Sequence, residues 1–410
     1  MGKERKDQKQ QFIVILTITF LGFLGISIPY LIFPPLFLNP EYSFLPGSWE
    51  TSTRALFLGV TLAVYPLGQF IGSPILGALS DDYGRKNLLS TSLIFTAICN
   101  LLIGIAIAKQ HLALLIIGRF LAGLMEGNVA IARAMCADLK LLSKHKTFGT
   151  INAAASIAFI IGPFLGGLLT DKTLYEALTT STPFFATSIV FFLLTPLSAL
   201  LLKEPKILNS LKSQTVWERF NFIKRLSNLF SNKNLKKLII TSTLYTLAVD
   251  ILYEFGPVYL TVKWIIGPAE LLLYNGLLCI GLALSNGWLS GFIASRVSQP
   301  FTITCSMIAF IFLLLGLICT NAPLFMLIWF GLLGIFIGIS TNFLTVKISD
   351  TASNSMQGEV MGTQLSLRVL GDSLICLFGG ALLILSAKVI LAIAAAIALG
   401  AIIYYMQAKV

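Results

Sequence analysis

Twelve apolar stretches of about twenty residues follow one another along the chain, separated mostly by short polar connections. A helix needs about 20 consecutive apolar residues to cross the hydrocarbon core of a bilayer. The composition fits this pattern, because 56% of the 410 residues are hydrophobic and only 11% are charged. Soluble domains carry roughly 25% charged residues. We therefore expect an all-α membrane protein with twelve transmembrane helices.

The expected helices lie at residues 12–38, 53–79, 87–108, 112–137, 147–169, 182–202, 236–261, 269–294, 301–320, 323–346, 358–385 and 389–407. One connection is long, polar and basic. It divides the chain into an N-terminal six-helix bundle (1–203), a cytoplasmic linker (204–235) and a C-terminal six-helix bundle (236–410).

Lysine and arginine are distributed unevenly between the two sides of the membrane. Connections on the side of the N-terminus carry 21 of the 29 basic residues, those on the other side carry 5, and 3 lie inside helices. Cytoplasmic connections are enriched in these residues, so we expect both termini in the cytoplasm. The same distribution explains the net charge of +11 without nucleic-acid binding.

The first apolar run is too long for a cleaved signal peptide.

The two halves resemble each other at a nearly constant offset. Gly77 and Gly291 near the ends of helices two and eight lie 214 residues apart, and Asp138 and Asp350 lie 212 apart. Glycines of helices five and eleven match at 213: Gly149 with Gly362, Gly166 with Gly379 and Gly167 with Gly380. Two halves in the same orientation are a repeat plan of transporters, with the substrate site near the midplane between them.

The loop after the second helix reads GALSDDYGRK over residues 77–86. It resembles the signature loop of the major facilitator superfamily, except that Asp82 replaces a basic residue. The resemblance implies a pseudo-symmetric fold of two six-helix bundles and a cytoplasmic gate. Its gating residues would be Gly77, Asp81, Gly84, Arg85 and Lys86, and Asp81 would interact with the N-terminus of helix eleven. A simple charged turn is the alternative.

Helix four carries Arg119, Glu126 and Arg133 at intervals of seven, so all three share one helix face. Charges inside a membrane are costly unless they are paired or face water. Arg119 also fits the helix-four motif of the same superfamily, with Ala122 in place of a glutamine. We expect these residues on the substrate or proton pathway, and a static charge network is the alternative.

Helix five contains Gly149, Gly162, Pro163, Gly166 and Gly167. Their spacing resembles the antiporter signature of the superfamily, with Ala158 replacing one glycine. Small residues let helices approach closely, so these five are expected helix-packing residues. With residues 137–149, they extend the resemblance to the drug:proton antiporter branch of tetracycline-type and related multidrug exporters. The resemblance implies a bacterial inner (plasma) membrane.

The second half has its own intramembrane charges. Asp250 and Glu254 are one turn apart on helix seven, and Arg368 and Asp372 are one turn apart on helix eleven. Clustered carboxylates beside an arginine can titrate near neutral pH, as proton coupling requires. We place these four on the substrate or proton pathway as well. A static, paired network is again the alternative.

The expected function is secondary active transport of small molecules by alternating access, with proton-coupled efflux. The alternatives are a proton-coupled importer of a metabolite or siderophore, and a non-transporting receptor or scaffold with the same fold. No nucleophile–histidine–acid set, phosphate loop or metal cluster predicts an enzyme. The six cysteines include no C-x-x-C pair. We expect no cofactor and no metal; the partners are substrate, protons and the lipid bilayer, and the protein is a monomer.

Overall fold

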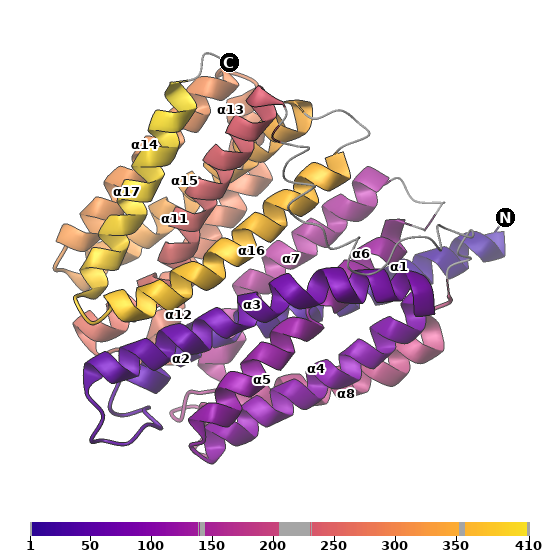
Figure 1. Ribbon diagram of the computed structural model, residues 1–410, viewed down its shortest axis with the longest axis horizontal. Coiled ribbons are helices and arrows are strands. Elements are labelled where there is room, and N and C mark those ends of the chain that lie inside the picture. Colours follow the sequence, from indigo (N-terminus) through magenta and orange to yellow (C-terminus); the bar gives the residue numbers. More distant parts are fainter. Residues whose placement is uncertain are drawn as a thin grey trace. The chain divides into compact units, whose positions relative to one another are not determined.

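The computed structural model of the chain describes residues 2–137, 139, 144–204, 230, 232–351 and 357–407, and its elements are labelled in Figure 1. Within these ranges all the regular elements are helices. The first half contains α1 (Gly2–Ser27), α2 (Pro29–Leu38), α3 (Thr51–Tyr83), α4 (Arg85–Ala108), α5 (Leu112–Met125), α6 (Gly127–Ala137), α7 (Lys144–Leu168) and α8 (Thr182–Leu201). The second half contains α11 (Lys233–Trp264), α12 (Pro268–Leu284), the π-helix η1 (Ser285–Leu289), α13 (Ser290–Ala294), α14 (Gln299–Cys319), α15 (Pro323–Thr351), α16 (Gln357–Leu382) and α17 (Ala387–Met406).

The membrane-spanning pattern expected from the sequence is confirmed. Among the described residues, ten helical stretches are long and apolar enough to cross a bilayer, and two shorter apolar ones cover Ile157–Leu168 and Glu270–Leu284. These correspond to the twelve expected spans. Three spans are less regular than predicted: the first is interrupted at Ile28, the fourth is interrupted at Glu126, and the eighth contains η1. Most of the predicted linker, residues 205–229 and 231, lies outside the described residues.

The chain divides into two compact units. Unit 1 comprises residues 1–36, 44–46 and 64–221, and unit 2 comprises residues 37–43, 47–63 and 222–410. Within unit 1, α4 lies beside α5 and α8, and α1 lies beside α7. Within unit 2, α11 lies beside α17, α12 beside α15, and α14 beside both α15 and α17 (Figure 1).

A glycine-lined contact joins α3 to α5 and α6 inside unit 1. Each side contributes two glycines four residues apart. These are Gly68 and Gly72 on α3, and Gly123 of α5 and Gly127 of α6 on the opposite side. A Cβ atom added at Gly72 would lie 2.6 Å from the Cα of Leu124. One added at Gly127 would lie 2.6 Å from the Cβ of Leu76. Such pairs of small residues let two helix backbones touch, so substitution would force the helices apart.

Unit 2 repeats this contact between α12 and α15. Gly281 and Ser285 correspond to Gly68 and Gly72, at an offset of 213 residues. Gly334 and Gly338 correspond to Gly123 and Gly127, at an offset of 211 residues. A Cβ atom on Gly281 would lie 2.9 Å from the nitrogen of Ile335. In unit 1 the corresponding distance, from Gly68 to the nitrogen of Leu124, is also 2.9 Å. The two units therefore use the same backbone contact at matching positions, and residues can be compared pairwise around it.

Candidate functional site

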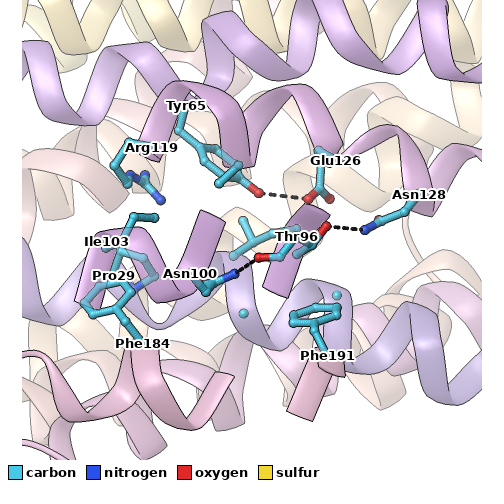
Figure 2. A pocket seen from close by; sticks show the side chains of 14 residues that line it. Pro29, Tyr65, Thr96, Asn100, Ile103, Arg119, Glu126, Asn128, Phe184 and Phe191 are labelled. Atoms are coloured by element: carbon cyan, nitrogen blue, oxygen red, sulfur yellow. Dashed lines mark hydrogen bonds between the residues drawn. The ribbon is translucent and has the colours of Figure 1, made fainter. Parts of the chain in front are cut away.

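Unit 1 contains a pocket whose empty volume, open solvent included, is about 390 Å³. Figure 2 shows that its side chains come from helices distant in sequence. The polar part is formed by Tyr65 of α3, Thr96 and Asn100 of α4, Arg119 of α5, Asn128 of α6, and Glu126 between α5 and α6. The apolar part includes Gly22, Gly25, Ile26 and Pro29 of the first span, Ile103, Ala122, and Phe184 and Phe191 of α8. The pocket is thus polar on one side and apolar on the other.

Arg119 lies between two aromatic rings. Its guanidinium carbon is 4.3 Å from the ring centroid of Tyr65 and 5.0 Å from that of Phe33, and the residue is only 7% exposed. The negative face of an aromatic ring attracts a cation, by about 0.5–2 kcal/mol depending on solvent exposure. The rings therefore offset part of the cost of burying this charge and hold the guanidinium in place.

Glu126 is buried next to the same tyrosine. The hydroxyl of Tyr65 donates a hydrogen bond to Oε2 of Glu126 at 2.8 Å, drawn as a dashed line in Figure 2. Glu126 occupies a turn between α5 and α6, and is only 6% exposed. The flanking Gly123 and Gly127 disfavour a continuous helix, and they bring this turn against α3. The carboxylate is consequently positioned by a helix break that the regular spacing on helix four did not predict.

Two asparagines extend the polar side of the pocket. Asn128 donates from Nδ2 to Oγ1 of Thr96 at 3.3 Å, and Asn100 donates from Nδ2 to the carbonyl oxygen of Thr96 at 2.9 Å (Figure 2). All three residues are buried. They form a short chain of hydrogen-bonding groups inside the bundle.

The structure therefore brings Arg119 and Glu126 to the same pocket, while the side chain of Arg133 lies outside the described residues. Sequence reasoning missed Tyr65, Asn100 and Asn128. A usable signal for Tyr65 was its position three residues before Gly68, because the Gly68–Gly72 pair predicts where α3 approaches another helix.

The equivalent positions of unit 2 are apolar. With the offsets of the repeated glycine contact, Tyr65 corresponds to Leu278, Arg119 to Phe330 and Glu126 to Ile337. All three unit 2 side chains are buried, at 3%, 3% and 1% exposed. The same helix contact thus forms without a polar group at any of these positions. The polar residues of unit 1 are not needed to build it.

A second charged group lies in unit 2, between α11 and α16. Arg368 donates from Nε to Oδ2 of Asp250 at 2.9 Å and from Nη2 to Oδ1 at 2.6 Å. Asp250 is buried, whereas the side chain of Arg368 is 46% exposed. Carboxylate oxygens of Glu254 and Asp372 and the sulfur of Cys376 lie within 4.8 Å of one another nearby. The four predicted charges of the second half are therefore gathered on two adjacent helices.

The loop motif of residues 77–86 begins in α3 and ends at the start of α4. Gly84 has a φ of +94°, which glycine tolerates better than other residues. The next two backbone nitrogens, of Arg85 and Lys86, donate to the carboxylate of Glu204 at 2.6 Å and 3.0 Å. Glu204 thereby caps the N-terminus of α4, a role that the sequence did not indicate. The side chain of Asp81 and its proposed partner region at the start of α16 lie outside the described side chains.

The glycines expected to pack helix five face α1 within unit 1. A Cβ atom on Gly162 would lie 2.7 Å from the carbonyl oxygen of Leu24, and one on Gly166 would lie 2.9 Å from that of Ile28. Pro163 lies inside α7 between them. Gly167 is buried in the same helix, and the side-chain surroundings of Gly149 lie outside the described residues.

Comparisons of the sequence with known proteins point to one protein family. The family model of the Major Facilitator Superfamily matches residues 15–375. The tetracycline resistance protein, class H, of Pasteurella multocida is 35% identical over 48% of this chain and 45% of its own length. Multidrug resistance protein 2 of Bacillus subtilis (strain 168) is 30% identical over 55% of this chain and 52% of its own. The matched region thus spans about half the length of these curated relatives.

Solved structures agree on the architecture. The nucleoside transporter NupG superposes with a TM-score of 0.73, covering 97% of this chain and 98% of that one, at 15% sequence identity. An identity this low supports the fold alone. Together with the spans described above, it makes this chain an integral, multi-pass membrane protein with the fold of membrane transporters.

Proposed function

The chain belongs to the Major Facilitator Superfamily, and on that basis we propose that it exports small molecules by alternating access in exchange for protons. The observation that carries the proposal is the buried group of Tyr65, Arg119 and Glu126 in the pocket of unit 1. Family and fold are those of transporters rather than enzymes. The direction of transport, the coupling ion and the substrate are the parts that we propose.

The position of this charged group favours a role in transport over a structural role. Placing an ionisable side chain within a membrane costs roughly 2–3 kcal/mol or more, so such residues usually mark a substrate or ion pathway. Unit 2 forms the same helix contact with Leu278, Phe330 and Ile337 instead. Since the fold does not require the charges, their cost is best explained by a place on the substrate or proton pathway.

Glu126 is the proposed proton carrier of unit 1. It is buried, it accepts a hydrogen bond from Tyr65, and it lies in a pocket that also contains a cation. A carboxylate in these surroundings can gain a proton when the transported molecule leaves and lose it when the next one binds. The charges between α11 and α16 form the second proposed part of the pathway.

Two features favour export over import. The glycine and proline pattern of α7 is similar to that of antiporters, and the curated relatives above are named for tetracycline and multidrug resistance. We propose lipophilic, drug-like molecules as substrates. We also propose that both termini lie in the cytoplasm, because of the distribution of basic residues, and that Asp81 acts in a cytoplasmic latch, because of the loop motif.

Transport by purified protein in liposomes tests this proposal directly. Tetracycline and the permanent cation ethidium serve as probes, with the membrane potential clamped and empty liposomes as the blank. An antiporter accumulates a probe in liposomes that are acidic inside, because outward proton flow drives the probe inward. A symporter accumulates it in liposomes that are alkaline inside. Failure of the folded protein to move either probe in response to a pH gradient would contradict proton-coupled drug export.

One pair of variants tests the assigned carrier. Glu126→Gln should lose gradient-driven accumulation and keep probe exchange across the membrane, since exchange needs no net proton movement. The matched control is Glu176→Gln, because Glu176 is an exposed acid outside the pocket. It should behave as the parent protein. Gradient-driven accumulation by Glu126→Gln at the parental rate would remove Glu126 from the mechanism.

A further inference from the structure

Tyr65 touches both charged residues of the pocket in unit 1. Its ring lies against the guanidinium of Arg119, and its hydroxyl donates to Glu126 (Figure 2). Each contact uses a different part of the side chain, the π face for one and the O–H group for the other. A single substitution, Tyr65→Phe, therefore separates them, because it removes the hydrogen bond and retains the ring.

The backbone holds Tyr65 in this position independently of its side chain. A Cβ atom on Gly123 would collide with the carbonyl oxygen of Tyr65 and would lie 3.2 Å from the nitrogen of Gln69. This contact belongs to the glycine-lined meeting of α3 with α5. Since Glu126 follows Gly123 by one helical turn, the contact also fixes the carboxylate relative to the tyrosine. The hydrogen bond is therefore preorganised.

Unit 2 shows that an aromatic or hydroxyl-bearing residue is not required at this place. Leu278 occupies the position equivalent to Tyr65, and the carbonyl of Leu278 meets Gly334 as the carbonyl of Tyr65 meets Gly123. A leucine thus satisfies the helix contact. The hydroxyl of Tyr65 must be explained by what it binds.

We propose that Tyr65 is a positioning residue that orients Glu126 and sets the pH range in which this carboxyl group exchanges its proton. The inference rests on the proposed role of Glu126. A hydrogen bond donated to a carboxylate favours its ionised form. Tyr65 therefore stabilises the ionised carboxylate of Glu126 through this hydrogen bond, and it keeps the released state available for substrate exchange.

Other charged groups near Tyr65 are few among the described residues. Arg119 faces it from α5 and Glu126 from the turn after α5, and the Cys99 thiol of α4 is close enough to interact electrostatically. The first span and α8 contribute glycine, isoleucine, proline and phenylalanine to the pocket. Arg133 follows Glu126 by seven residues, and its side chain is not described. Arg119 is unchanged in Tyr65→Phe, so its effect is common to both proteins.

Infrared titration of the purified protein tests the inference without any substrate. The C=O band of protonated Glu126 is identified by its loss in Glu126→Gln, and its intensity is followed against pH. Tyr65→Phe should shift the midpoint upward by about one pH unit, since a hydrogen bond to a charged group is removed. Tyr65→Leu should shift it at least as far. The pH profile of gradient-driven transport should move in the same direction.

Tyr405→Phe is the matched control. Tyr405 is also a buried tyrosine beside a cation: its hydroxyl accepts from Nζ of Lys347 at 2.9 Å, and its ring centroid lies 5.2 Å from that nitrogen. It belongs to unit 2 and lies outside the pocket. Its substitution should leave the Glu126 band unchanged.

The outcomes separate this inference from the proposed function. A Glu126 band that titrates at the parental midpoint in folded Tyr65→Phe and Tyr65→Leu overturns the role of Tyr65 alone. Absence of any Glu126 titration in the parent protein overturns the proton-carrier role, and the inference with it. Equal shifts in Tyr65→Phe and Tyr405→Phe would indicate a general loss of structure and would also contradict the positioning role.

Discussion

Arg368 of α16 and Asp250 of α11 form a two-point ion pair, with donor–acceptor distances of 2.9 Å and 2.6 Å across 118 residues of sequence. The two partners differ in environment, because Asp250 is 6% exposed at its side chain and Arg368 is 46% exposed. The consequences of losing either partner should therefore differ.

Arg368→Gln should destabilise the protein more than Asp250→Asn. The first substitution leaves a buried carboxylate without its counter-ion, whereas the second leaves an arginine whose side chain is 46% exposed. Loss of one partner from a fully buried pair costs 3–5 kcal/mol, and the exposure of Arg368 reduces this to about 1–3 kcal/mol. Thermal unfolding in detergent measures the order. The double variant should recover part of the loss, and strictly additive effects would contradict the pairing.

The sequence predicted the charges of this group but paired them differently. Spacing along one helix places Asp250 near Glu254 and Arg368 near Asp372. The observed pair crosses from α11 to α16, and such a contact depends on which helices meet and at what rotation. Periodicity within one helix carries no information about either. The spans were predictable because hydrophobic length is a local property, and the pairing was not because it is a tertiary one.

The glycine-lined contact in unit 1 should be sensitive to a single methyl group. Gly72→Ala should lower stability by about 1–3 kcal/mol, because the added carbon would press into the backbone of Leu124. Gly276→Ala is the control, since a Cβ atom there would meet nothing within 4 Å. That variant should be neutral or slightly more stable, as alanine favours helices by up to about 1 kcal/mol. Equal thermal stability of the two variants would argue against the close contact.

Glu204 should stabilise the beginning of α4. Its carboxylate accepts hydrogen bonds from the nitrogens of Arg85 and Lys86, which have no partner within their own helix. Glu204→Ala should cost about 0.5–2 kcal/mol, as for other helix caps, and hydrogen exchange at the first turn of α4 should become faster. Glu176→Ala, which removes an exposed acid, should change neither. Unaltered exchange at Arg85 and Lys86 in Glu204→Ala would refute the capping role.

The pocket residues show the same limit of sequence reasoning at the site. Arg119 and Glu126 were placed on one helix face by their spacing, and the structure brings both into one pocket. Tyr65 comes from another helix, and it reaches the pocket because α3 and α5 pack closely through their glycines. Even the position of Glu126 depends on a helix break between two of these glycines. The charged residues were therefore predictable as a set, whereas their geometry followed from packing.

Exchanging the polar trio of unit 1 for the residues of unit 2 should separate folding from transport. The triple variant Tyr65→Leu, Arg119→Phe, Glu126→Ile copies the apolar solution found at Leu278, Phe330 and Ile337. Because the glycine contact is unchanged and no charge is left buried alone, the triple variant should fold and insert normally. It should nevertheless lose gradient-driven transport.

The single variant Arg119→Phe provides the comparison. It leaves the carboxylate of Glu126 buried beside Tyr65 without the nearby cation. Its free energy of unfolding should therefore be about 1–3 kcal/mol lower than that of the triple variant, and it should unfold at a lower temperature. A network that exists to hold the helices together would give the reverse order, with the triple variant the least stable. Thermal unfolding and size-exclusion profiles of the two variants therefore decide between a structural and a functional origin of these charges.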